Sequence, residues 1–324
     1  METLQDIRRP IEVELKQYRM LFEETLQSNN PILHLALSHL LQRQGKMMRP
    51  ILVFLAAKMV GKVNERVLHA AVSLELLHTA SLVHDDVVDE SDRRRGQRSV
   101  NALLDNKAAV LVGDFLLSKA LYHAAQTGSN RVVTWVSELG QILSDGELQQ
   151  LANTDSKEFS EDVYYEIIEK KTASLFSCCG RIGAFLAGAD DESVLIMSNF
   201  GKYVGLCFQL RDDIFDYDQI NEAGKPTGND MREGKLTLPV LHALLTSEEN
   251  LQRDSALKVR AGEASEEEMA GLVTFAFNQG GIAYATKAMH DYCDKALGLL
   301  NKNRDSDIAE SLRSYVRFVA NRSL

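Results

Sequence analysis

The sequence predicts an all-α fold that forms one domain over residues 1–324. Only five prolines occur, and none lies between Pro50 and Pro226, a stretch rich in Leu and Ala. Proline breaks helices, whereas Leu and Ala favour them, so long helices are expected there. We find no sustained alternation of apolar and polar residues and no Asn-Gly turn, so no strand is expected. No linker or internal repeat divides the chain.

Long buried helices are predicted over residues 67–89, 106–125, 132–151 and 194–217, because each of these segments is apolar on nearly all sides. Loops are predicted over residues 91–99, 126–131 and 221–234, where glycines and polar residues gather. Residues 247–269 are strongly charged and are expected to form a solvated surface hairpin. These assignments describe a helical bundle with short connections.

Composition excludes several classes of protein. Apolar residues make up 45% of the chain, and the net charge of −10 is spread along it, which argues against a nucleic-acid partner. The four cysteines show no zinc-ligand spacing and are expected to be buried thiols. The N-terminal residues do not resemble a signal peptide, and no run of about 18 apolar residues occurs, so a cytoplasmic protein without a membrane span is expected.

Two aspartate clusters carry the functional prediction. Both have the form D-D-x-x-D and both end an apolar helix; they consist of Asp85, Asp86 and Asp89, and of Asp212, Asp213 and Asp216. Aspartates three and four residues apart share a helix face, where their charges repel unless cations lie against them. Mg²⁺ prefers such carboxylate oxygens and keeps sites for phosphate. The clusters are therefore expected to face a shared, metal-filled cavity.

Two simpler interpretations of the clusters are possible. An acidic helix face can be a solvated surface, but solvated faces rarely follow buried apolar turns such as residues 82–84 and 207–210. A four-helix di-iron protein also gathers carboxylates, but it requires two Glu-x-x-His pairs. This chain has only the pair of Glu75 and His78.

Basic residues near the clusters would complete a site for two diphosphates. Arginine binds phosphate oxygens through paired N–H donors, and a loop that leads into a helix favours anions. Alone, each of these residues is most simply a surface charge; their closeness to the aspartates in the sequence is what selects them. The residues are Lys46 and Arg49, Arg94 and Arg95, Lys171, and Lys225 with Lys235.

Together these residues resemble the trans-isoprenyl diphosphate synthases (trans-prenyltransferases), and within them the long-chain polyprenyl enzymes of the octaprenyl and solanesyl type. The resemblance extends from about residue 44 to the C-terminus. Its motifs are Gly45-Lys46-x-x-Arg49-Pro50; Glu75-x-x-His78-x-x-Ser81-Leu82-x-His84 leading into the first cluster; Arg94-Arg95-Gly96; Gly113-Asp114; Lys171-Thr172-Ala173; Gln209 leading into the second cluster; and Gly234-Lys235-x-Thr237-Leu238-Pro239.

This resemblance implies the class I isoprenoid synthase fold, a homodimer, and Mg²⁺ that ionises an allylic diphosphate for attack by isopentenyl diphosphate. By motif, Asp85, Asp86 and Asp89 would hold two Mg²⁺ ions, and Asp212 with Asp213 and Asp216 a third. The other implied roles are as follows: Arg94, Lys171, Lys225 and Lys235 grip the allylic diphosphate; Lys46, Arg49, His78 and Arg95 bind isopentenyl diphosphate; and Thr172 and Gln209 stabilise positive charge along the reacting carbons.

The sequence departs from the family pattern in two places. Gln44 stands where a first glycine is frequent, and the first cluster lacks the two-residue insertion common in bacterial and eukaryotic farnesyl synthases. One turn before Asp85, the small residues Ala80 and Ser81 predict an open tunnel and a product of roughly C30 to C50, of the kind used for quinone side chains. Alternatively, these two residues only permit close helix packing.

Other functions remain as alternatives. The first is a shorter-chain farnesyl or geranylgeranyl diphosphate synthase. A class I terpene cyclase would lack the second D-D-x-x-D and the isopentenyl diphosphate pocket. A non-catalytic partner subunit would lose carboxylates that this chain keeps. A metal-storage bundle would not need the paired arginines. Transient membrane contact during product release is also conceivable, because the product would be very apolar.

Overall fold

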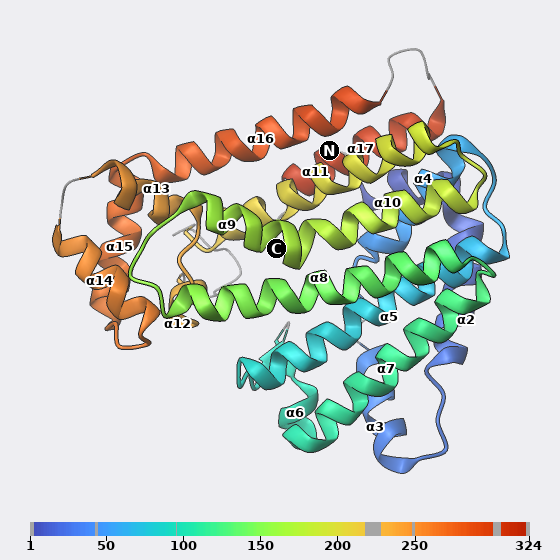
Figure 1. Cartoon of the computed structure of the whole chain (residues 1–324), viewed down its shortest axis with the longest axis horizontal. Helices are drawn as coiled ribbons and strands as arrows, with labels where there is room; N and C mark the ends of the chain where they lie inside the picture. Colours follow the sequence, from blue (N-terminus) through green and yellow to red (C-terminus); the bar gives the residue numbers. More distant parts are fainter. Residues whose placement is uncertain are drawn as a thin grey trace. The chain divides into compact units, whose positions relative to one another are not determined.

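The computed structural model describes residues 3–42, 45–94, 96–217, 228–247, 250–300 and 306–321, and these residues are almost entirely helical (Figure 1). The all-α prediction is therefore confirmed. The chain divides into two compact units. Unit 1 comprises Met1–Gln141, Leu175–Gly201 and Asn301–Ser314; unit 2 comprises Ile142–Ser174, Lys202–Leu300 and Tyr315–Leu324. Each unit is considered by itself, and the single-domain assignment stays a prediction.

Unit 1 contains the N-terminal helices and one small hairpin. Its helices are α1 (Leu4–Arg8), the 3₁₀ turn η1 (Arg9–Ile11), α2 (Glu12–Thr25), α3 (Pro31–Leu41), α4 (Met48–Val60), α5 (Glu65–Val88), α6 (Val100–Leu103) and α7 (Asn106–Gln126). Strands β1 (Arg93–Arg94) and β2 (Gln97–Arg98) pair antiparallel, with Arg94 opposite Gln97. The expectation of no strand is wrong at this one place. Gly96, at φ +77°, supplies the left-handed residue that a tight reversal needs.

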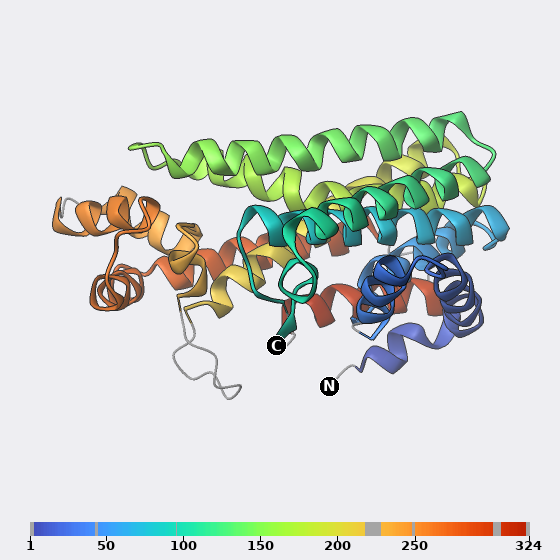
Figure 2. The same ribbon diagram turned by 90° about the horizontal axis from the view of Figure 1, so that it is seen from below.

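Helices α5 and α7 are the main pair of unit 1 and lie side by side (Figures 1 and 2). Helix α5 begins where Oδ1 of Asn64 accepts the amide N–H of Val67, and α7 begins where Oδ1 of Asp105 accepts that of Ala108. The predicted helices 67–89 and 106–125 are confirmed. Both are long and apolar enough to cross a membrane by length and composition alone, a test that core helices also pass.

Unit 2 contains most of the C-terminal half of the chain. Its helices are α9 (Glu161–Ile168), the π-helix η2 (Glu169–Ala173), α12 (Asn229–Arg232), α13 (Leu238–Thr246), α14 (Asn250–Arg260), α15 (Glu266–Asn278) and α16 (Gly281–Leu299). Helices α8 (Asn130–Thr154), α10 (Ser174–Leu186), α11 (Asp191–Phe215) and α17 (Asp307–Asn321) have residues in both units. Helices α8 and α11 confirm the predictions over 132–151 and 194–217.

The charged segment 247–269 forms the helical hairpin of α14 and the start of α15. The hairpin is confirmed, but the expectation that solvent surrounds it fully is wrong. Ala256 and Val259 are buried, and Arg260 is only 5% exposed because its guanidinium donates to the carbonyls of Ser156 and Glu158. A buried arginine with these partners fixes the connection between α8 and α9.

Two expectations about side-chain burial have different outcomes. All four cysteines are buried, as predicted. Helix α7 is not buried all round, since Val110, Leu111, Leu121 and Tyr122 are exposed. The apolar pattern of a helix indicates which residues are buried, but it does not indicate whether they are buried by the same chain or by a partner.

Candidate active site

The first aspartate cluster lies at the C-terminal end of α5, and its three carboxylates have different surroundings. Asp86 is 3% exposed and accepts a hydrogen bond from Nε of Arg94 at 2.7 Å. Asp85 is half-buried and Asp89, just after the helix, is exposed. Asp89 lies four residues after Asp85 and three after Asp86, so its side chain neighbours both along the helix, and the three carboxylates differ in burial. Arg94, expected to bind the allylic diphosphate, thus also contacts the first cluster.

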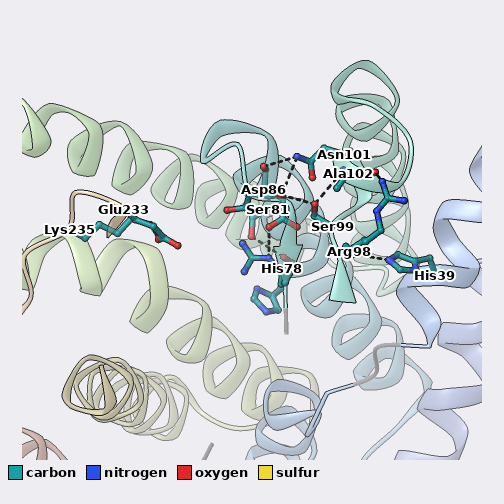
Figure 3. A network of polar contacts seen from close by, with 12 residues as sticks. His39, His78, Ser81, Asp86, Arg98, Ser99, Asn101, Ala102, Glu233 and Lys235 are labelled. Carbon is teal, nitrogen blue, oxygen red and sulfur yellow. Dashed lines mark hydrogen bonds and ion pairs between the residues drawn. The ribbon is translucent and has the colours of Figure 1, made fainter. Parts of the chain in front are cut away.

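The end of α5 is held by polar side chains that the motifs did not reveal. Nδ2 of Asn101 donates to the carbonyls of Asp86 and Ser91, at 3.1 and 3.3 Å, and the hydroxyl of Ser99 donates to Ser91 at 2.6 Å (Figure 3). Glu90, at φ +49°, reverses the chain directly after the cluster. Ser99 is recognisable from sequence only as the N-cap of α6, with no sign that it acts on α5.

The Gly113-Asp114 motif is explained by the ring of His84. A Cβ atom on Gly113 would lie 2.1 Å from Nε2 of His84, so only glycine admits this ring between α5 and α7. Nε2 of His84 lies 3.2 Å from the carbonyl oxygen of Val110 and 3.5 Å from Oδ1 of Asp114. The motif therefore fixes the residue that precedes Asp85.

The first basic motif lies at the start of α4, as predicted. Met47 adopts the left-handed conformation, with φ 52° and ψ 37°, directly before the helix. Such strain in a non-glycine residue is typical of functional sites. Lys46 is exposed, and the guanidinium of Arg49 lies 5.0 Å from the centre of the Phe176 ring.

A cavity in unit 1 is lined by residues of both this motif and the first cluster. Its polar end contains His78, Asp86 and Arg94, and Gly45 and Met47 on either side of Lys46 also line it. Its apolar side is formed by Tyr18, Phe22, Leu26, Leu40, Leu82 and Val83. Neither Ala80 nor Ser81 lines this cavity; Ala80 is buried and the hydroxyl of Ser81 donates to the carbonyl of His78. Their role in chain length stays a prediction.

The second cluster lies at the C-terminal end of α11, in unit 2. Asp213 is 3% exposed, and both of its oxygens accept hydrogen bonds, from the hydroxyl of Tyr164 at 2.5 Å and from Nε2 of Gln209 at 2.8 Å. Asp216 accepts the backbone N–H groups of Asn229 and Asp230 at 2.9 and 3.0 Å. Tyr164 is a site residue that the sequence motifs did not indicate.

Burial and crowding raise the pKa values of these carboxyls. Burial, and then the nearby Asp212 and Asp216, raise the pKa of Asp213 to about 7. Burial also raises the pKa of Asp216, and the pKa of Asp230 is raised well above its usual range by burial and by the nearby Asp213. Asp230 therefore belongs to this acidic group, although it lies outside both D-D-x-x-D motifs. A hard cation would relieve this repulsion, so the donor set fits Mg²⁺.

Thr172 and Gln209, expected to lie along the reacting carbons, do meet. The hydroxyl of Thr172 donates to Oε1 of Gln209 at 2.7 Å, and Gln209 in turn donates to Asp213. Thr172 lies on the π-helix η2, a feature that is frequent at functional sites. A chain of hydrogen bonds thus connects Thr172 to the second cluster.

The predicted lysines have ion-pair partners. Nζ of Lys171 lies 2.8 Å from Oε2 of Glu147, and Nζ of Lys235 lies 2.7 Å from Oε2 of Glu233. Lys235, Gln209, Asp213 and Asp230 line a cavity of about 570 Å³ in unit 2. Arg95, Lys225 and Gln44 lie outside the described residues.

The first cluster belongs to unit 1 and the second to unit 2, so the shared metal-filled cavity stays a prediction. Among the residues that the structure describes, no three carboxylate, imidazole or thiol groups converge closely enough to hold a metal ion by themselves. A cation held by one or two carboxylates together with substrate phosphate is the arrangement typical of Mg²⁺.

Comparison with known proteins identifies the family of this chain. The polyprenyl synthetase family model matches residues 30–274. The chain is 36% identical to octaprenyl diphosphate synthase of Haemophilus influenzae over 88% of its own length and 79% of the relative's. It is also 36% identical to heptaprenyl diphosphate synthase component 2 of Geobacillus stearothermophilus, over 93% of each chain.

A solved structure extends this likeness to the fold. The crystal structure of geranylgeranyl pyrophosphate synthase from Bacteroides thetaiotaomicron superposes with a TM-score of 0.88 at 44% identity, covering 99% of this chain and 100% of the other. The resemblance seen in the motifs is thereby confirmed. The chain belongs to the polyprenyl synthetase family and is a prenyltransferase.

Proposed function

We propose that this prenyltransferase condenses isopentenyl diphosphate head-to-tail with an allylic diphosphate, farnesyl or geranylgeranyl, and repeats the step to give a trans polyprenyl diphosphate. The observation that supports this reaction best is the continuous hydrogen-bonded set of Thr172, Gln209, Asp213 and Tyr164. It joins a hydroxyl and an amide, the groups suited to a developing carbocation, to an acidic group suited to a cation.

In the proposed reaction the bond between the allylic carbon and the diphosphate oxygen breaks, and the carbocation is attacked by the double bond of isopentenyl diphosphate. The proton then lost can pass to the released diphosphate. Mg²⁺ bound to Asp85, Asp89 and Asp212 would neutralise charge on the leaving group. Asp86, which accepts a hydrogen bond from Arg94, and Asp213, which accepts hydrogen bonds from Tyr164 and Gln209, would orient the clusters.

The basic residues would divide between the two substrates. Arg94, Lys171, Lys225 and Lys235 would hold the allylic diphosphate. Lys46, Arg49, His78 and Arg95 would hold isopentenyl diphosphate, an assignment supported by the cavity that His78 shares with the residues flanking Lys46. Arginine and lysine suit these roles because they bind phosphate through several N–H donors.

A long product, roughly C30 to C50, is proposed because Ala80 and Ser81 are small one turn before the first cluster. Such a product suits a quinone side chain, and its apolar tail favours transient membrane contact at release by a protein of the cytoplasm. The likeness to a geranylgeranyl enzyme at 44% identity favours a shorter product as the second candidate.

A homodimer is proposed from the exposed apolar face of α7. Val110, Leu111, Leu121 and Tyr122 recur at helical spacing and are between 41% and 67% exposed, which is unusual for a surface that meets only water. A second copy would cover this face isologously. Sedimentation of the purified chain would show a dimer, which Leu111→Asp should dissociate.

One incubation tests the proposed reaction. The purified chain is mixed with Mg²⁺, labelled isopentenyl diphosphate, and geranyl, farnesyl or geranylgeranyl diphosphate, and the products are separated by chain length. Products longer than the primer are expected only when Mg²⁺ and isopentenyl diphosphate are both present. Cyclic hydrocarbons formed without isopentenyl diphosphate would indicate a terpene cyclase. No product from the chain alone would indicate a subunit that needs a different partner.

A further inference from the structure

The segment 145–150 of helix α8 holds the side chain of Lys171 at two points. Nζ of Lys171 lies 2.8 Å from Oε2 of Glu147 and 2.8 Å from Oε1 of Gln150. The side chains of Lys171 and Glu147 are only 21% and 30% exposed, so solvent screens this ion pair less than a surface pair. Neither Glu147 nor Gln150 belongs to the motifs that selected Lys171.

The backbone brings this part of α8 unusually close to the π-helix. A Cβ atom on Gly146 would lie 2.8 Å from Cβ of Lys170, 3.0 Å from Cγ of Lys171 and 3.2 Å from the backbone nitrogen of Lys171. Only glycine allows that approach. The π-helix η2 adds its extra residue at the same place, which turns Lys171 toward α8 and Thr172 toward Gln209.

The ammonium group keeps one donor for a ligand. A lysine ammonium has three N–H donors, and Glu147 and Gln150 accept two of them. The long lysine stem is otherwise flexible, and ordering it when a ligand binds would cost entropy. Because Glu147 and Gln150 already order the side chain of Lys171, most of that entropy cost is removed. The same two contacts also fix the direction of the third N–H.

Lys170, the preceding residue, provides an internal comparison. Its Nζ lies 2.7 Å from Oδ2 of Asp145 and 2.9 Å from Oε1 of Gln149. This second carboxylate and amide pair repeats the arrangement around Lys171 on the neighbouring face of α8, but Asp145 is 65% exposed. Exposed ion pairs of this kind contribute little.

We propose that Glu147 and Gln150 are positioning residues, which hold the Lys171 ammonium where it meets the allylic diphosphate. This inference rests on the proposed function, since it assigns Lys171 to that substrate. The diphosphate then meets an ordered N–H donor in place of a mobile one.

The test measures KM for farnesyl diphosphate and for isopentenyl diphosphate separately. Glu147→Ala should raise the KM for farnesyl diphosphate about tenfold or more, since small losses of alignment have large effects, and leave that for isopentenyl diphosphate unchanged. Glu147→Gln, which keeps an acceptor but not the charge, should lie between. Asp145→Ala, the matched control on the Lys170 pair, should change neither value. An unchanged KM for farnesyl diphosphate in Glu147→Ala would overturn the proposal.

A double variant separates positioning from a general effect on folding. In a Lys171→Ala background, Glu147→Ala should have no further effect on KM, because the side chain it positions is absent. A full additional effect there would also overturn the proposal. Isothermal titration calorimetry with a non-reactive farnesyl thiodiphosphate measures the affinity of each variant for the allylic substrate without turnover. If the unmodified chain fails to elongate any primer, the proposed function fails; if it elongates but Glu147→Ala has no effect, only this inference fails.

Discussion

The guanidinium of Arg94 holds the buried carboxylate of Asp86, with 2.7 Å between Nε and Oδ1. The second cluster repeats this relationship with different partners, since its second aspartate, Asp213, accepts hydrogen bonds from Tyr164 and Gln209. In both clusters the second aspartate is 3% exposed. The D-D-x-x-D pattern thus combines carboxylates that can face a cation with one that attaches the helix end to the protein.

This division of roles predicts different effects for neighbouring substitutions. Asp86→Ala leaves Arg94 without its carboxylate partner and should lower the free energy of unfolding by about 2 kcal/mol. Asp85→Ala, at a half-buried position, should cost less stability but abolish turnover. Urea denaturation and turnover of the two variants check this. Equal loss of stability in both would contradict the assignment.

Tyr164→Phe should weaken the response to Mg²⁺ without unfolding the protein. The substitution removes only the hydroxyl that holds Asp213, and losses of such supporting hydrogen bonds typically reduce metal affinity about 10- to 100-fold. Half-maximal activity should therefore require correspondingly more Mg²⁺. Tyr165→Phe, on the next residue, is the control and should leave the Mg²⁺ requirement as it is. The same titration curve for both variants would show that Tyr164 does not act through the cluster.

Ala80→Phe should shorten the product to about farnesyl or geranylgeranyl length, because a bulky ring one turn before Asp85 would close the proposed tunnel. Leu82→Phe is the informative control. Leu82 lines the cavity of unit 1, whereas Ala80 does not. The substitution Leu82→Phe should therefore leave the product length unchanged. Chromatography of the products after removal of the diphosphate measures both. If only Leu82→Phe shortens the product, the growing chain occupies the cavity of unit 1.

His123 should make a contribution to the pH dependence of stability that destabilises the fold as the pH is lowered below about 6.5. Its side chain is 3% exposed between Thr25 and His69, and burial lowers its pKa to about 4. Between these pH values the unfolded chain binds a proton at His123 that the folded chain does not, so folding is disfavoured by up to about 3 kcal/mol. Above pH 6.5 this contribution is constant.

Thermal unfolding at pH 7.5 and pH 5 measures the effect of His123. His123→Gln keeps a hydrogen-bonding side chain without a titratable ring, so the melting temperature of this variant, relative to that of the unmodified chain, should be higher at pH 5 than at pH 7.5. The same change between the two pH values in both proteins would show that His123 does not contribute.

The sequence by itself determined the helical class, the main helices and the family. Proline-free apolar segments leave few alternatives to helix, and α5, α7, α8 and α11 begin and end within a few residues of their predicted limits. The aspartate and lysine motifs were sufficient for the family because their residue types and spacing are specific. Helical spacing also indicated which aspartates share a face.

Only the tertiary structure decided what lies opposite those faces. Tyr164 joins Asp213 from another helix, Asp230 joins the second cluster from α12, and Glu147 contacts Lys171 where Gly146 lets the two helices approach. Periodicity describes one helix at a time, so it contains no information about the partner that packing brings. The family could therefore be predicted from the sequence, whereas the partners that orient each charged group depend on helix packing.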